Sequence, residues 1–94
     1  MYSFRIFLKG KQGRSQKALR DFKAFLELCF KNNYTLDVVD IMTDADLAEA
    51  DGVLATPTVL KLGPPPKKRV IGDLSNPEML LMAFGLERDG QGDK

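Results

Sequence analysis

The sequence predicts an α/β domain whose elements follow the order β-α-β-α-β-β-α. Three observations support this: alternating polarity at residues 2–9, an apolar stripe with helical spacing at residues 15–31, and two short apolar segments joined by a proline-rich connector at 64–68. A strand, a helix and a second strand in succession imply a parallel pair with a right-handed crossover. The connector is short enough to make the last two strands an antiparallel hairpin.

The first strand is expected to lie inside the sheet. Tyr2, Phe4, Ile6 and Leu8 fall on one face, which fits the period of two of a β-strand. Phe7 interrupts the polar face on the other side. An apolar residue on each face indicates a strand that is covered on both sides.

The remaining elements are bounded by capping and turn residues. Ser75 and Glu78 have the spacing of a capping box at the start of the last helix. Ser15 is expected to cap the first helix. The full expected order after the first strand is a helix at 15–31, a strand at 35–41, a short helix between 44 and 52, strands at 59–62 and 69–71, and a helix from 75 to 86. We expect one domain at 1–86 and a disordered polar tail at 87–94.

This order of elements is the thioredoxin-like arrangement, a four-stranded mixed sheet with helices on both faces. Thr56 and Pro57 stand directly before the third strand, where that fold carries a cis-proline. The fold therefore predicts a structural cis bond at Pro57. The alternative is a trans proline that begins an edge strand, because cis is uncommon among X–Pro bonds in general.

Composition excludes several classes of function. The chain has 94 residues, a formal net charge of +1, no histidine and one cysteine. The charge balance argues against a nucleic-acid binder, and no apolar run is long enough for a membrane span. One cysteine rules out an internal disulfide, and the absence of histidine removes that residue as metal ligand or general base. We expect a cytoplasmic protein with no metal and no cofactor.

Thiol and glutathione chemistry are also disfavoured. The loop at 10–15 holds no cysteine, although dithiol exchange in this fold requires a reactive thiolate there. Cys29 lies on the apolar stripe of the first helix and is interpreted as a small buried residue. Ser15, Pro57, Asp73 and Ser75 loosely imitate a glutathione site, but Leu74 separates the acid from the serine. We expect no enzymatic activity.

Charges are segregated along the chain. Residues 9–23 hold six basic side chains and one acid, whereas 37–51 hold six acids and no base. Lys67, Lys68 and Arg69 follow three prolines and form a basic turn. A role in protein binding and an ordinary solvated surface are equally compatible with this turn.

Two segments carry a resemblance to a known family. Residues 54–58 read Leu-Ala-Thr-Pro-Thr, and 63–76 combine a triple proline, a basic pair and the run Ile-Gly-Asp-Leu-Ser-Asn. At this spacing the sequence is similar to the KaiB family of circadian clock proteins, over about residues 2–86.

The resemblance implies a regulator without catalytic activity that binds the KaiC ATPase ring, with KaiA or a SasA-like kinase as further partners. It implies two folds: a tetrameric ground state with a rearranged C-terminal half, and a thioredoxin-like monomer that binds KaiC. An alternative within the same resemblance is an adaptor or sensory module like the N-terminal domain of SasA, acting outside the oscillator.

Some residues match the pattern of the KaiB family and others depart from it, and both affect what the resemblance implies. The basic residues that match partner-binding positions of the family, together with the rest of the basic turn, are Lys17, Lys61, Lys67, Lys68 and Arg69. Asp37 and Gly52 stand where clock-type members usually carry lysine, which indicates a divergent paralogue. Ala83 replaces a glycine and favours the helical, monomeric state, whereas Gly85 is expected to oppose it weakly as a glycine inside a helix.

Overall fold

A computed structural model describes residues 1–86 of the chain, and the predicted polar tail at 87–94 lies outside the described residues. The elements follow the predicted order. They are β1 (Tyr2–Leu8), α1 (Arg14–Phe30), β2 (Tyr34–Asp40), α2 (Ala45–Ala50), β3 (Thr58–Gly63), β4 (Lys68–Ile71) and α3 (Pro77–Phe84).

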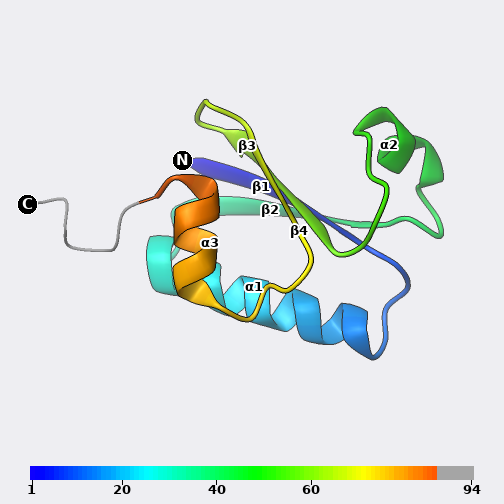
Figure 1. Ribbon diagram of the computed structural model, residues 1–94, viewed down its shortest axis with the longest axis horizontal. Coiled ribbons are helices and arrows are strands. Elements are labelled where there is room, and N and C mark those ends of the chain that lie inside the picture. Colours follow the sequence, from blue (N-terminus) through cyan, green and yellow to red (C-terminus); the bar gives the residue numbers. More distant parts are fainter. Residues whose placement is uncertain (87–94) are drawn as a thin grey trace, which may run out of the picture.

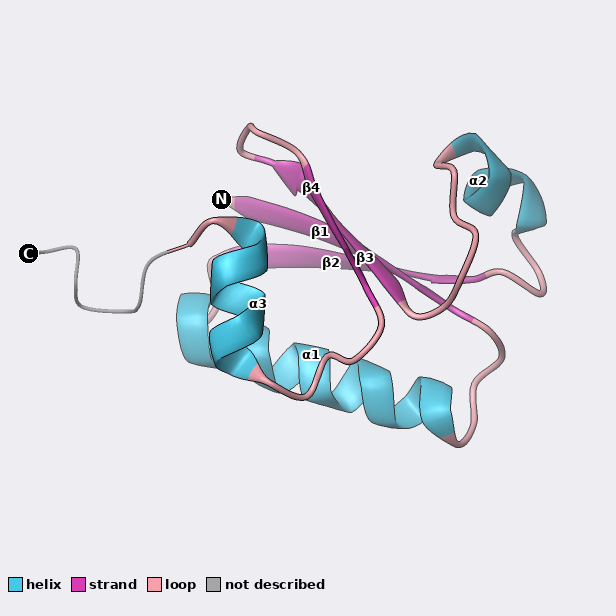
Figure 2. Ribbon diagram, viewed as in Figure 1, coloured by secondary structure: helices cyan, strands magenta, loops and turns pink. Residues whose placement is uncertain are grey.

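The four strands form one mixed sheet in the order β2-β1-β3-β4. β1 pairs with β2 in parallel, whereas the β1–β3 and β3–β4 pairs are antiparallel. Helices α1 and α3 lie together on one side of this sheet, and α2 stands apart from them (Figures 1 and 2). The mixed sheet with helices on both faces is the architecture that the sequence predicts.

The larger core lies between the sheet and helices α1 and α3. It contains Phe4, Ile6 and Leu8 of β1, which are at most 4% exposed. Phe84 of α3 reaches into this layer, and its ring centroid lies 5.4 Å from that of Phe4 in an edge-to-face arrangement. Aromatic side chains thus attach the last helix to the central strand.

A smaller core lies on the opposite face of the sheet. Phe7 is fully buried there and packs with Val39 of β2 and Ala48 of α2. The interruption of the polar face of β1 therefore marks the contact with α2. The expectation that both faces of this strand are covered is confirmed.

Both helix caps of α3 differ from the sequence interpretation. The N-cap is Asn76, not Ser75, and its side chain accepts hydrogen bonds from the backbone N–H groups of Glu78 and Met79. Gly85 is the C-cap, with a left-handed φ of 70°. Glycine is favoured in that conformation, so Gly85 supports the end of the helix and does not weaken its interior, while Ala83 lies within α3.

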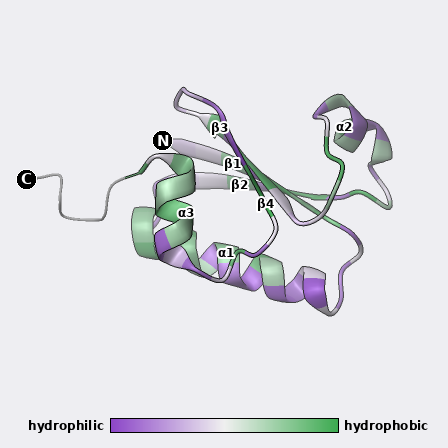
Figure 3. Ribbon diagram, viewed as in Figure 1, coloured by the Kyte–Doolittle hydropathy of each residue, from purple (hydrophilic) through white to green (hydrophobic). Residues whose placement is uncertain are grey.

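Helix α3 is hydrophobic along most of its length (Figure 3). Leu80, Leu81 and Phe84 are buried, whereas Met79 and Met82 are 60% and 80% exposed. The apolar character of the helix therefore extends from the core to the protein surface.

The peptide bond between Thr56 and Pro57 is cis, as the fold predicts. Residues 64–66, between β3 and β4, form what we call the proline turn. Two further peptide bonds there are also cis, namely Gly63–Pro64 and Pro65–Pro66. The hydroxyl of Thr58 donates to the carbonyl of Ala55 at 2.6 Å, which closes the loop around Pro57.

Candidate functional site

Four of the five predicted partner-binding residues, all except Lys17, line one groove. The groove has a volume of about 370 Å³ and lies between the end of α2 and the hairpin of β3 and β4. It is lined by Ala50, Asp51, Leu60, Lys61, Lys67, Lys68 and Arg69. We call this surface the basic groove.

Lys61 is part of the wall of the groove but not of its exposed surface. Only 4% of the residue is exposed, and its Nζ donates to the carbonyl oxygens of Pro64 at 2.6 Å and of Pro66 at 2.9 Å. The ammonium also lies 5.9 Å from the centre of the Tyr2 ring. The structure therefore places this charge inside the molecule, where it bonds to the proline turn.

The side chain of Arg69 also forms hydrogen bonds within the protein. Its two terminal nitrogens donate to the backbone carbonyls of Asp51 at 2.6 Å and of Gly52 at 3.1 Å. These carbonyls follow the last turn of α2, where a cation is stabilised by the helix dipole and by carbonyls that lack partners. Arg69 thus fastens strand β4 to the end of α2.

Lys67 and Lys68 differ from their two neighbours. Both are exposed, and within residues 1–86 neither forms an ion pair or a hydrogen bond through its side chain. We call these two ammonium groups, which have no partner within residues 1–86, the free cations; the stem of Lys68 lies beside the end of α3, with its Cε 3.9 Å from the position of a Cβ on Gly85. In water, such cations can meet the carboxylates of a partner without first breaking an internal bond.

Lys17 lies outside the basic groove. Its Nζ is 2.7 Å from Asp21 Oδ2, one turn along α1. It lines a separate cleft of about 320 Å³, next to Pro57 and Asp73. The hydroxyl and backbone N–H of Ser75 lower the pKa of Asp73, and the charge of Lys17 adds to this effect.

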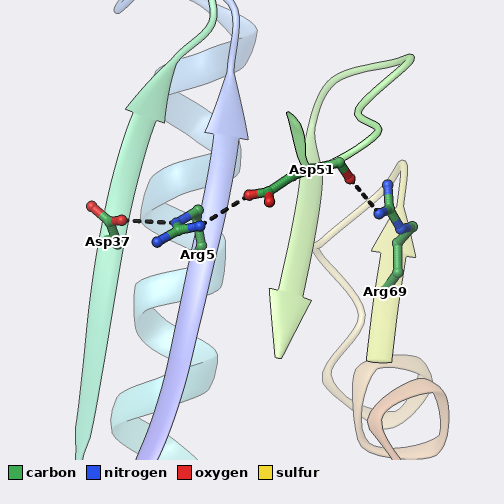
Figure 4. A network of polar contacts seen from close by, with 4 residues as sticks. All are labelled: Arg5, Asp37, Asp51 and Arg69. Atoms are coloured by element: carbon green, nitrogen blue, oxygen red, sulfur yellow. Dashed lines mark hydrogen bonds and ion pairs between the residues drawn. The ribbon is translucent and has the colours of Figure 1, made fainter. Parts of the chain in front are cut away.

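A polar network beside the groove was not anticipated from the sequence. Arg5 Nε lies 2.8 Å from Asp37 Oδ2, and its Nη1 lies 2.9 Å from Asp51 Oδ2 (Figure 4). Because Asp51 also accepts from Arg69 through its carbonyl, the network joins β2, β1, the end of α2 and β4. Asp37 and then Asp51 raise the pKa of Arg5, which keeps the guanidinium charged.

The network includes both residues at which the sequence is expected to depart from the family that it resembles, Asp37 and Gly52. Asp37 is the parallel register partner of Arg5 and pairs with it. Gly52 has a φ of 69° and presents its carbonyl to Arg69. A left-handed φ favours glycine, so the departure at this position also fits its backbone conformation.

Asp40 holds the loop that leads from β1 into α1. Its Oδ1 accepts hydrogen bonds from the backbone N–H of Gly10 at 3.0 Å and of Met42 at 2.9 Å. The bond from Gly10, followed by that from Met42, lowers the pKa of the carboxyl below its ordinary value of 3.8. The ionised form is therefore the one that the folded chain prefers.

We expect the low pKa of Asp40 to affect how the free energy of unfolding falls at acid pH. A carboxyl whose pKa is lower in the folded state stabilises above its unfolded pKa of 3.8 and loses this contribution as the pH falls through the folded value. The free energy of unfolding should therefore fall less between pH 5 and pH 2 in Asp40→Asn than in the wild type. Urea denaturation across this range measures the difference. Asp46→Asn, at an exposed position of α2, is the control, and an identical acid limb in all three proteins would contradict the assignment.

The cleft at the start of α1 lacks the thiols of a redox site. It has a volume of about 260 Å³ and is lined by Leu8, Lys9, Gln12, Arg14, Ser15, Thr56 and Pro57. Ser15 lies inside α1 rather than at its cap, and its hydroxyl donates to the carbonyl of Lys9 at 2.7 Å. Cys29 packs against the larger core, but it is only partly buried there and not fully buried as its position on the apolar stripe predicts.

Residues 1–86 contain neither a candidate membrane-spanning helix nor a candidate metal site. Among these residues no helix combines the length and the apolar character that a membrane crossing requires. The same part of the chain holds no group of three or more cysteine, aspartate and glutamate residues arranged to hold a metal ion.

Solved structures with the same fold include two of different kinds. The N-terminal domain of SasA from Synechococcus elongatus matches with a TM-score of 0.69 and 19% identity, over 84% of this chain and 74% of that one. Chloroplastic thioredoxin z matches with a TM-score of 0.72 and 16% identity, over 90% and 76% of the two chains. At these identities the likeness defines the fold, so the chain is a protein of the thioredoxin-like class.

The sequence comparisons are more specific. The family model for the KaiB domain matches residues 5–86. The circadian clock oscillator protein KaiB of Thermostichus vulcanus is 41% identical over 93 residues, which cover 99% of this chain and 86% of that protein. The protein of the same name from Prochlorococcus marinus strain MIT 9313 is 41% identical over 88 residues, 94% of this chain and 74% of that protein. The chain belongs to the KaiB family.

Proposed function

We propose that this protein is a non-enzymatic clock regulator of the KaiB type. In this proposal it binds a KaiC-type ATPase ring in its thioredoxin-like state and competes with or recruits other clock proteins, such as KaiA or a SasA-like kinase. The observation that carries the proposal is 41% identity with named clock oscillator proteins over 99% of the chain.

The basic groove supports a docking role for this fold. Lys67 and Lys68 are exposed at the end of a hairpin whose other cations are bonded internally. Because these cations follow a turn that is already held in place, the backbone loses little conformational entropy when they meet an acidic surface. Charges at the rim of an interface mainly raise the association rate and make it depend on salt.

The thioredoxin-like state is also proposed to be the monomeric, binding-competent form of the free protein. In the described fold, Ala83 is within α3 and Gly85 ends that helix in the left-handed conformation. Ala83 favours a helix, and Gly85 favours the end of one, at a place where the alternative tetrameric state would need a strand. Sedimentation of the free protein at micromolar concentration tests this point.

A second candidate function is an adaptor that occupies the same surface of a KaiC ring outside the oscillator. The observation that supports this second function is the shared fold with the SasA N-terminal domain, which matches with a TM-score of 0.69. An adaptor would bind the ring without displacing KaiA or changing the phosphorylation rhythm of KaiC. Reconstitution with the ring and KaiA separates the two functions.

We expect the double variant Lys67→Ala, Lys68→Ala to bind a KaiC ring about 2- to 30-fold more weakly than the wild type. This range corresponds to about 0.2–1 kcal/mol for each exposed charge. Titration at low and high salt measures both the affinity and its salt dependence. The salt dependence should be smaller in the variant, because two of the cations that are screened by salt are gone.

The matched control is Arg20→Ala, Lys23→Ala, which removes two exposed cations from α1 and leaves the basic groove intact. This control should bind like the wild type. Equal affinity and equal salt dependence in all three proteins would make the groove an ordinary surface. Absence of binding by the wild type would refute the proposed docking itself.

A further inference from the structure

Within the proposed docking function, on which this inference rests, we propose that Lys61 is a positioning residue. It holds the proline turn at 64–66 so that Lys67 and Lys68 meet the acidic surface of the partner, and it makes no contact with the partner itself. The basic groove then contains two kinds of cation, those that build the turn and those that bind.

The burial of Lys61 argues against direct contact. With 4% of the residue exposed, almost none of its surface is available to another molecule. A buried ammonium is strongly disfavoured unless hydrogen bonds compensate its lost hydration. Here the carbonyls of Pro64 and Pro66 provide that compensation at 2.6 and 2.9 Å, so a partner carboxylate would have to replace bonds that already exist.

The proline turn needs donors from elsewhere in the chain. Residues 64–66 have no backbone N–H and therefore cannot donate hydrogen bonds to the neighbouring strands. The β3–β4 ladder reaches outward only to the pair formed by Lys61 and Lys68. The carbonyls of the turn are thus its available hydrogen-bonding groups, and Lys61 donates to two of them.

The strand register links Lys61 to one of the free cations. Lys61 and Lys68 are direct partners across the antiparallel β3–β4 pair. Like charges in this arrangement repel each other. Because the carbonyls of the turn hold the ammonium of Lys61, the repulsion keeps the ammonium of Lys68 away from it, and the stem of Lys68 lies beside Gly85 at the end of α3, with its Cε 3.9 Å from the position of a Cβ there.

The first test compares two variants with the same kind of substitution. Lys61→Met keeps an unbranched stem but removes the ammonium, whereas Lys67→Met, Lys68→Met removes the free cations. Titration of a KaiC ring at two salt concentrations should show Lys61→Met binding roughly 2- to 10-fold more weakly, because a looser turn must be ordered on binding. Its salt dependence should equal that of the wild type, whereas that of the double variant should be reduced.

Two further measurements do not need the ring. In Lys61→Met, nuclear relaxation should show larger backbone motion at residues 67–69 than in the wild type, and the double variant should show no such change. In the wild type, acetylation by acetic anhydride, followed by mass spectrometry, should modify Lys67 and Lys68 well before Lys61. The ring should protect Lys67 and Lys68 and leave the slow rate of Lys61 unchanged.

The outcomes separate this inference from the docking proposal. If the wild type fails to bind the ring, docking is refuted, while relaxation and acetylation still decide whether Lys61 holds the turn. Fast acetylation of Lys61 in the free protein would overturn the inference even if Lys61→Met does not fold. A reduced salt dependence in Lys61→Met would make Lys61 a contact residue, and unchanged affinity with unchanged backbone motion would remove its positioning role.

Discussion

Replacement of Phe84 by alanine is expected to lower the free energy of unfolding by about 3–5 kcal/mol. Phe84 is 1% exposed and is the aromatic side chain through which α3 enters the larger core. Its ring centroid lies 5.4, 6.2 and 6.3 Å from those of Phe4, Phe22 and Phe25. Truncation would leave a cavity against all three rings, which belong to strand β1 and helix α1.

A loss of this size is large relative to the free energy of unfolding of a small domain. Folded domains are stable by about 5–15 kcal/mol, so a loss of this size removes a large share of the stability of the variant. Urea denaturation followed by circular dichroism measures the change. Met82→Ala, at a side chain of the same helix that is 80% exposed, is the control and should change stability by less than about 0.5 kcal/mol. Equal losses in the two variants would show that α3 is not fastened through Phe84.

The order of elements could be predicted because the relevant signals are local. The alternation of β1 and the stripe of α1 are written in consecutive residues, and Phe7 indicated a second covered face that α2 indeed provides. Helix caps depend on single backbone angles, which the sequence does not display. For that reason Asn76, not its neighbour Ser75, caps α3, and Gly85 falls at the C-cap rather than inside the helix.

The candidate site could be predicted only in part. The sequence groups Lys61, Lys67, Lys68 and Arg69 by their charge, and the structure places all four in the lining of one groove. Charge and turn composition could not reveal which of these cations are bonded within the protein, because this depends on how the hairpin folds over its own carbonyls. One signal was available: Lys61 shares its strand face with buried Val59, two residues earlier, which indicates an inward lysine.

The network around Arg5 depends on contacts between distant parts of the sequence. Arg5 and Asp51 are 46 positions apart, and no local pattern connects them. The parallel register places Arg5 beside Asp37, but a register follows from the assembled sheet and not from either strand alone. This distance in sequence is why composition and spacing did not identify the network.

Replacement of Arg5 by methionine is expected to cost about 1.5–3 kcal/mol, the range for hydrogen bonds that involve charged groups. The variant retains an unbranched side chain on β1 but leaves Asp37 and Asp51 without their shared cation. The two carboxylates then lack charge compensation on the same face of the sheet. The end of α2 also loses its tie to the central strand, since the bond from Arg5 Nη1 to Asp51 spans 2.9 Å between them.

The two halves of this network should contribute unequally. The side chain of Asp37 is 53% exposed, so water screens its pair with Arg5, and the coupling energy should be about 0–1 kcal/mol. Arg5 and Asp51 are 23% and 25% exposed, and their less hydrated pair should couple more strongly. Double-mutant cycles of Arg5→Met with Asp37→Asn and with Asp51→Asn measure both energies by urea denaturation. A stronger coupling to Asp37 would place the stabilisation between the two parallel strands, and the attachment of α2 would then rest on the packing of Ala48 and on the bonds from Arg69.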